Sequence, residues 1–181
     1  MQGVTTREIT EAAEQRNTSA VTYHFGSRQG LLRHLLARRG APIDAERGRL
    51  RSELDGSPTV PQLVRCLVVP YASLLDDEPG RSYLRIVAQL RGRFAAWRVE
   101  SDAATTQHLA QILDELESRP GPPLAVRRER VLALIMLLTA AVAERARRID
   151  DLAGQELAGD ELDHDQFVDN LVDMCAAVLT A

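Results

Sequence analysis

Residues 17–39 read NTSAVTYHFGSRQGLLRHLLARR, and this stretch is the most informative part of the chain for its architecture. Asn17 precedes a short segment that ends in Tyr-His-Phe, and Ser27 precedes a longer segment with leucines at helical spacing. Asn and Ser are favoured N-caps, and a Gly-Ser pair interrupts a helix. The pattern predicts a helix over about 18–25 and a second one beginning after Ser27.

The rest of the sequence is also helical in character. Aromatic residues make up only 4% of it, and Leu, Ala, Arg and Glu, all good helix formers, are abundant. We therefore expect an all-α protein. Turn-forming residues separate further helices, expected from Thr5 or Thr6 and over 59–75, 81–97, 102–117, 124–151 and 165–179.

Charge is unevenly distributed along the chain. The net charge is −4, but residues 1–55 hold nine Arg and seven acids (+2), so the remainder carries −6. A basic N-terminal part on an acidic body suits a small module that contacts a polyanion. All 22 basic residues are Arg, and the absence of Lys excludes a P-loop or Schiff-base mechanism.

Two short helices joined by a turn and followed by a longer one form a helix-turn-helix arrangement. Ile9 with Ala13, and Val21 with Phe25, are expected to form two buried stripes that pack together. The second helix then directs small and hydroxyl residues outward, toward base edges in a major groove: Thr18, Ser19, Ala20 and Thr22. Phosphate contacts are expected from Thr6, Tyr23, His24 and Arg28.

The segment TTREITEAAEQRNTSAVTYHFGSRQGLLRHLL resembles the DNA-binding domain of the TetR family of bacterial transcriptional regulators. The resemblance implies a DNA-binding domain over 1–41 and an effector-binding and dimerisation domain over 42–181. It implies a homodimeric repressor that binds a double-stranded DNA operator and is released by a small-molecule effector. Members of that family carry a further helix ahead of the Thr-rich start, whereas Met1 stands just before Thr5. Either the true start lies upstream, or the chain lacks that helix.

The segment 124–151 is apolar on nearly every face at its centre, and 165–179 is amphipathic. A helix that is apolar all round does not lie on the surface of a monomer. One interpretation is a two-fold dimer interface built from these two helices of each subunit. The other is a central core helix in a monomer.

Candidate effector-binding residues come from irregularity in the helical pattern. Pro70 should loosen its helix and free backbone carbonyls. The side chains that would line a cavity between helices are Tyr71, Arg85, Gln89, Phe94, Trp97 and Met136. Most of them would equally suit an ordinary core or surface.

The sequence offers nothing typical of an enzyme, a cofactor site or a metal site. It lacks the G-x-S-x-G, H-E-x-x-H, C-x-x-C and G-x-G-x-x-G motifs. Without a signal peptide or a bilayer-length apolar run, we expect a cytoplasmic protein with no membrane contact and with Cys66 and Cys175 reduced. Two alternatives remain open: a ligand-binding dimer of the same ancestry that has lost DNA binding, and a helical enzyme.

Overall fold

The computed structural model describes residues 5–15, 19–90, 106–151 and 162–181, and the side chain of Ala20 lies outside the description. Every regular element among these residues is a helix, so the prediction of an all-α protein is confirmed. None of the described helices combines the length and apolar character needed to cross a membrane.

The chain divides into two compact units, Met1–Arg39 and Gly40–Ala181. The first contains α1 (Thr6–Ala12), α2 (Ala20–Phe25) and the start of α3 (Arg28–Ser52). The division falls within α3, two residues before the end of the expected N-terminal domain at residue 41. One helix therefore belongs to both units, which the sequence did not predict.

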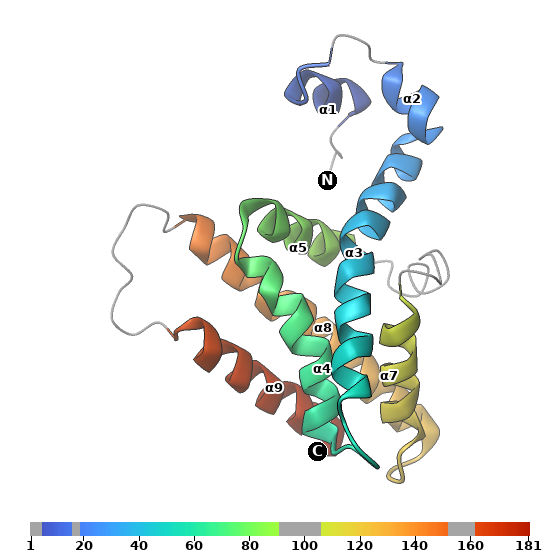
Figure 1. The fold of residues 1–181 in the computed structure, drawn as a ribbon, viewed down its shortest axis with the longest axis vertical. Coiled ribbons are helices and arrows are strands. Elements are labelled where there is room, and N and C mark those ends of the chain that lie inside the picture. The colour runs from blue at the N-terminus through green and yellow to red at the C-terminus, as the bar shows by residue number, and fades with distance from the viewer. Residues whose placement is uncertain (1–4, 16–18, 91–105, 152–161) are drawn as a thin grey trace. The chain divides into compact units, whose positions relative to one another are not determined.

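The second unit is built around α8. The limits predicted for this helix, 124–151, are confirmed. After the last turns of α3 it contains α4 (Val60–Ala72), a 3-10 turn (Ser73–Leu75), α5 (Glu78–Leu90), α7 (Gln107–Ser118), α8 (Leu124–Asp151) and α9 (His164–Thr180). Figure 1 shows α4, α5 and α9 beside α8, and α8 packs against all three and against α7.

The apolar character of α8 is explained by this central position. Leu134, Leu138 and Val142 lie on it almost without exposed surface, in one core with residues of α4, α7 and α9. Met136, by contrast, is 50% exposed. The described residues of the single chain therefore leave one side of α8 uncovered. On its buried side α8 is a core helix, and the dimer interface stays a prediction.

The helix ends follow the sequence closely because side chains satisfy the free backbone groups there. Reciprocal caps join Thr5 to Glu8, Thr59 to Gln62 and Asp163 to Gln166. The expected helix at 59–75 ends earlier, because α4 tightens into the 3-10 turn soon after Pro70.

Ion pairs fasten α5 to α8. Arg81 donates from Nε to Asp150 Oδ1 at 2.5 Å, and Arg85 binds the other carboxylate oxygen. The hydrogen bond from Arg81, followed by the charges of both arginines, lowers the pKa of Asp150 despite its partial desolvation. Asp150 therefore stabilises the fold while it is ionised, and this contribution is lost as the pH falls through its lowered pKa.

Both cysteines are buried and free, which agrees with the expectation of reduced thiols. Burial raises the pKa of Cys175 from 9.0 to about 11 and also raises the pKa of Cys66. Because the pKa of Cys175 is higher in the folded protein than in the unfolded chain, this thiol contributes to stability at every pH below the unfolded pKa. The contribution is lost as the pH rises through the folded pKa of about 11.

We predict that both thiols resist a thiol-reactive reagent at pH 8 in the native protein and react rapidly once urea unfolds it, because neither becomes an exposed thiolate while folded. The absorbance of the chromophore that the reagent releases measures the rate of this reaction. Ser118→Cys, at an exposed position at the end of α7, provides the positive control and should be labelled at once. Rapid labelling of the unmodified native protein would contradict the prediction.

Candidate functional site

The N-terminal unit positions the residues that were predicted to contact DNA. Thr5 caps α1 by accepting a hydrogen bond from the backbone N–H of Glu8 at 3.2 Å. Thr6 is therefore the first residue of the helix, and it is half-buried. Its hydroxyl lies in the first turn, where the positive end of the helix dipole favours anions.

The second helix presents consecutive polar and aromatic residues to solvent. Thr22, Tyr23 and His24 are all exposed, with Tyr23 exposed over 85% of its surface. Ser19 is the exposed N-cap residue, Ala20 begins the helix, and Thr18 lies outside the described residues. Since successive helical residues are rotated by about 100°, these side chains cover a broad face of a short helix.

The turn between α2 and α3 is built as predicted. Gly26 has a φ of 71°, in the left-handed region that glycine adopts without strain. Ser27 Oγ accepts from Gly30 N at 3.0 Å and so caps α3. Arg28, the first residue of α3, is exposed directly beside α2 in the sequence.

The apolar stripes of this unit differ from the prediction. Val21 is buried, whereas Phe25 and Ile9 are half-buried and Ala13 is exposed. Ala13 is exposed because α1 ends before it, so that it serves as the C-cap. Among the described side chains of residues 5–39, Thr10 and Val21 alone are buried, which leaves this unit with a thin core.

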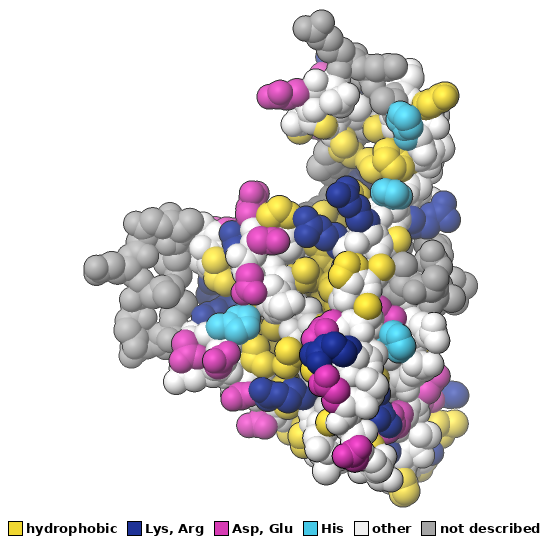
Figure 2. Space-filling model, in the orientation of Figure 1, with side chains coloured by type: hydrophobic (Ala, Val, Ile, Leu, Met, Phe, Trp, Pro, Cys, Tyr) yellow, Lys and Arg dark blue, Asp and Glu magenta, His cyan; other side chains and the backbone are white. Residues whose placement is uncertain are grey.

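The surface around α2 combines apolar and basic groups. The ring of Phe25 lies 5.2 Å from that of His34, and Figure 2 shows histidine and hydrophobic side chains together on the N-terminal unit. Between residues 15 and 43 the sequence holds five arginines and neither Asp nor Glu. Three of these arginines, Arg28, Arg33 and Arg38, are exposed on α3. The charge count over 1–55 underestimated how strongly basic this segment is.

The four described candidate effector residues lie on three helices, in different environments. Tyr71 is buried on α4, whereas Gln89 on α5 and Met136 on α8 are exposed. Arg85 is held by Asp150, so it links two helices. Phe94 and Trp97 lie outside the described residues. Helical spacing could not distinguish these separate environments.

A buried polar cluster that the sequence analysis missed lies in the second unit. The carboxylate of Asp44 accepts the backbone N–H groups of His108 at 2.9 Å and Leu109 at 2.8 Å, so it caps α7 from α3. Arg47 lies one turn later, with Nη1 3.8 Å from Asp44 Oδ1. Asp44 is only 2% exposed. The spacing of Asp44 and Arg47 was available in the sequence, but their burial was not.

Arg47 is the charged centre of this cluster. Burial lowers the pKa of its guanidinium, and the charges of Asp44, Tyr83 and Tyr71 oppose that shift. Its Nε is buried without a hydrogen-bond partner in the described part of the chain. A buried guanidinium with an unmet donor is costly for the protein alone and favourable for binding an acceptor group.

Two histidines of the second unit, His108 and His164, lie in different environments. His108 is half-buried, and its ring packs on α3 where a Cβ at Gly48 would come within 2.6 Å of it. His164 is exposed at the start of α9. Across residues 5–15, 19–90, 106–151 and 162–181 there is no cluster of three or more potential metal ligands.

The chain matches no protein-family model and no curated protein. The likeness of residues 5–36 to TetR regulators therefore remains a resemblance between short segments.

The close approach at Gly30 generates a prediction for this site. A Cβ there would lie 1.9 Å from the carbonyl oxygen of Phe25, so Gly30→Ala should force α2 and α3 apart locally. We expect amide hydrogen exchange of residues 20–36 to accelerate by tenfold or more. Gly121→Ala is the matched control, since a Cβ there meets no atom within 4 Å. Unchanged exchange in Gly30→Ala would show that the turn accommodates a side chain.

Proposed function

We propose that this protein is a sequence-specific DNA-binding transcriptional regulator, a dimeric repressor that a small-molecule effector releases from its operator. The observation that carries the proposal is the α2 surface. Exposed hydroxyl and aromatic side chains stand there within a segment of five arginines and no acid. An acid-free basic segment attracts phosphate, while small hydroxyl residues allow a helix to approach base edges.

The roles of the individual residues follow from their chemistry. In the proposed complex α2 enters the major groove, and Ser19, Ala20 and Thr22, together with Thr18 before them, face the bases. Tyr23 and His24 at the end of α2 and Arg28 at the start of α3 bind phosphate oxygens. Thr6 holds a further phosphate at the N-terminus of α1.

The dimer would form through α8 and α9, which pack against each other within the chain. Small and flexible apolar side chains are exposed on both helices. On α8 they are Ala133, Met136 and Ala140, and on α9 they are Met174 and Ala177. Such a surface allows close two-fold packing of four helices, and pairing would cover the uncovered side of α8.

Effector binding would take place in the helical body. The buried Arg47 guanidinium, with Tyr71 nearby, could receive an acceptor group of the effector. An effector that binds better to a dimer with a different separation of the two recognition helices would weaken operator binding by the same factor, through linkage.

A second candidate is a ligand-binding dimer of the same ancestry that does not bind DNA. The specific observation in its favour is the thin core of the N-terminal unit, where Thr10 and Val21 alone are buried among the described side chains of residues 5–39. Selection of duplexes from a random-sequence pool separates the two candidates. The regulator enriches one recognisable motif, and the ligand-binding dimer enriches none.

Arg28→Ala should weaken binding to every duplex by a similar factor, because a phosphate contact carries no sequence information. The slope of log K against log salt concentration should fall by about one unit. Fluorescence anisotropy at several salt concentrations measures both effects. Arg65→Ala, which removes an exposed arginine on α4, is the control and should leave the slope unchanged.

Thr22→Ala should weaken binding to the selected duplex by about 1–3 kcal/mol and leave binding to unrelated DNA nearly unchanged. The reason is that a hydrogen bond to a base edge exists only on the correct sequence. The same anisotropy titration on both duplexes measures it. An equal loss of affinity for both duplexes would show that Thr22 contacts the DNA backbone and not a base.

Met136→Glu should separate the dimer into monomers, because it places a charge at the centre of the proposed helical interface. Sedimentation velocity measures the change, and circular dichroism should show unaltered helix content, since Met136 is half-exposed in the single chain. Glu129→Gln, at an exposed position on the same helix, serves as the control. A stable dimer in Met136→Glu would place the interface elsewhere.

A further inference from the structure

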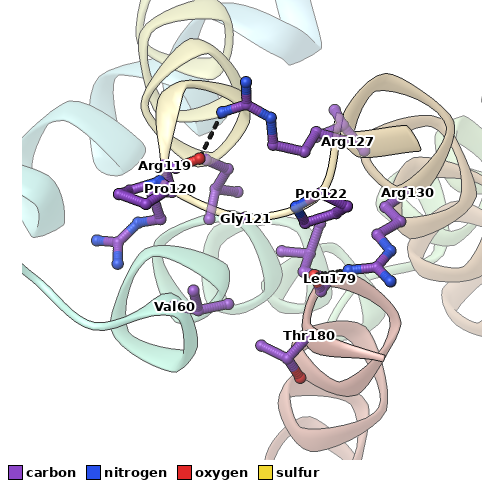
Figure 3. A pocket seen from close by; sticks show the side chains of 11 residues that line it. Val60, Arg119, Pro120, Gly121, Pro122, Arg127, Arg130, Leu179 and Thr180 are labelled. Atoms are coloured by element: carbon purple, nitrogen blue, oxygen red, sulfur yellow. Dashed lines mark hydrogen bonds between the residues drawn. The ribbon is translucent and has the colours of Figure 1, made fainter. Parts of the chain in front are cut away.

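A cavity of about 330 Å³ lies in the second unit, and none of its lining residues is a candidate effector residue. Its walls come from the start of α4, the loop between α7 and α8, the first turns of α8 and the end of α9, as Figure 3 shows. Its volume falls at the lower end of the range, about 300–1,000 Å³, that is usual for small-molecule sites.

Three arginines line this cavity, and each of them donates hydrogen bonds to main-chain oxygens. Arg119 donates to the carbonyl of Pro58, and Arg127 donates to the carbonyl of Arg119. Arg130 donates to Leu179 O at 3.1 Å and also to Ala181 O. Figure 3 shows the three guanidinium groups on different sides of the cavity, with the bonds of Arg127 and Arg130 as dashed lines.

The positive charge of Arg119 and Arg127 is not balanced by an ion pair in the described part of the chain. Arg128, their neighbour in sequence, is different: its Nε lies 2.8 Å from Glu117 Oε1, and it points away into solvent. Two further donors are unmet, because the Nε atoms of Arg119 and Arg127 are buried without a partner. Each guanidinium has five N–H donors, so most of them remain available.

The remaining walls are apolar. Val60 begins α4, Leu116 and Val131 belong to the core of the unit, and Leu179 closes the end of α9. Pro120 and Pro122 stiffen the loop that completes the cavity. Uncompensated cations beside apolar walls match a ligand that carries one anionic group on a short apolar chain.

We propose that this cavity, the arginine pocket, binds a small amphipathic anion, a carboxylate or phosphate ester with a short aliphatic tail. The anionic head accepts hydrogen bonds from the free donors of Arg127 and Arg119, and the tail lies against Val131 and Leu116. Arg130 keeps its bonds to the end of α9 and adds charge. The alternative is that the arginines only cap carbonyls at the ends of α7 and α9.

Isothermal titration calorimetry with octanoate and with octyl phosphate distinguishes anion binding from a purely structural role of the arginines. We expect at least one of them to bind at one site, tenfold or more tightly than 1-octanol, which lacks the charge, and than acetate, which lacks the tail. The tighter of the two identifies the head group. If neither binds more tightly than 1-octanol, the proposal fails and the arginines serve the fold alone.

Variants locate the binding. Arg127→Met should reduce the affinity for the better ligand at least tenfold, and Arg128→Met, which changes the adjacent arginine outside the cavity, should not. Because Arg127 also holds the loop, circular dichroism must show that Arg127→Met is folded. Gly121→Leu tests the same point with all arginines intact, since this cavity-lining residue has open space around its Cβ and a leucine there should obstruct the pocket. Unchanged affinity in either folded variant would overturn the assignment.

The titrations use the whole chain without DNA. Their outcome is therefore independent of the proposed DNA binding and of the effector residues around Arg47.

Discussion

The burial of α8 is the constraint on which the second unit depends. Its 28 residues contact α4, α5, α7 and α9, and its core residues, such as Leu134 and Val142, are almost fully enclosed. Polar contacts then fix the neighbours at defined positions. Asp150 holds α5 through two arginines, and Asp44 caps α7 from α3. Apolar burial supplies most of the stability, and these charged bonds select one arrangement of the helices.

The two units use arginine in opposite ways. In the second unit most of the described arginines form an ion pair with Asp or Glu, as Arg51 does with Glu115 and Arg81 with Asp150. The arginines between residues 15 and 43, by contrast, belong to a segment that contains neither Asp nor Glu. A basic surface without internal partners is available to an external polyanion. In the second unit, Arg119 and Arg127 of the arginine pocket likewise form no ion pair with a described residue, and a small anion is proposed to bind there.

Some helix limits were predictable from the sequence, because capping residues and turn residues act locally: the caps at Thr5 and Thr59 and the full length of α8 were expected. The start of α5 at Glu78 and the cap of α9 at Asp163 were not. Long-range packing was not predictable. Helical spacing cannot show that Ala13 ends a helix, or that the charged pair of Asp44 and Arg47 is buried. The arginine pocket arises where segments far apart in the sequence meet, so no local pattern indicates it.

We propose that α2 is the surface that recognises DNA. Hydrogen–deuterium exchange with and without a duplex selected from a random pool tests it most directly, because it reports the protected segment without any substitution. If α2 binds the duplex, exchange should slow over residues 19–28 and stay unchanged around the arginine pocket. Protection confined to the second unit, or none at a saturating concentration of the duplex, would contradict it.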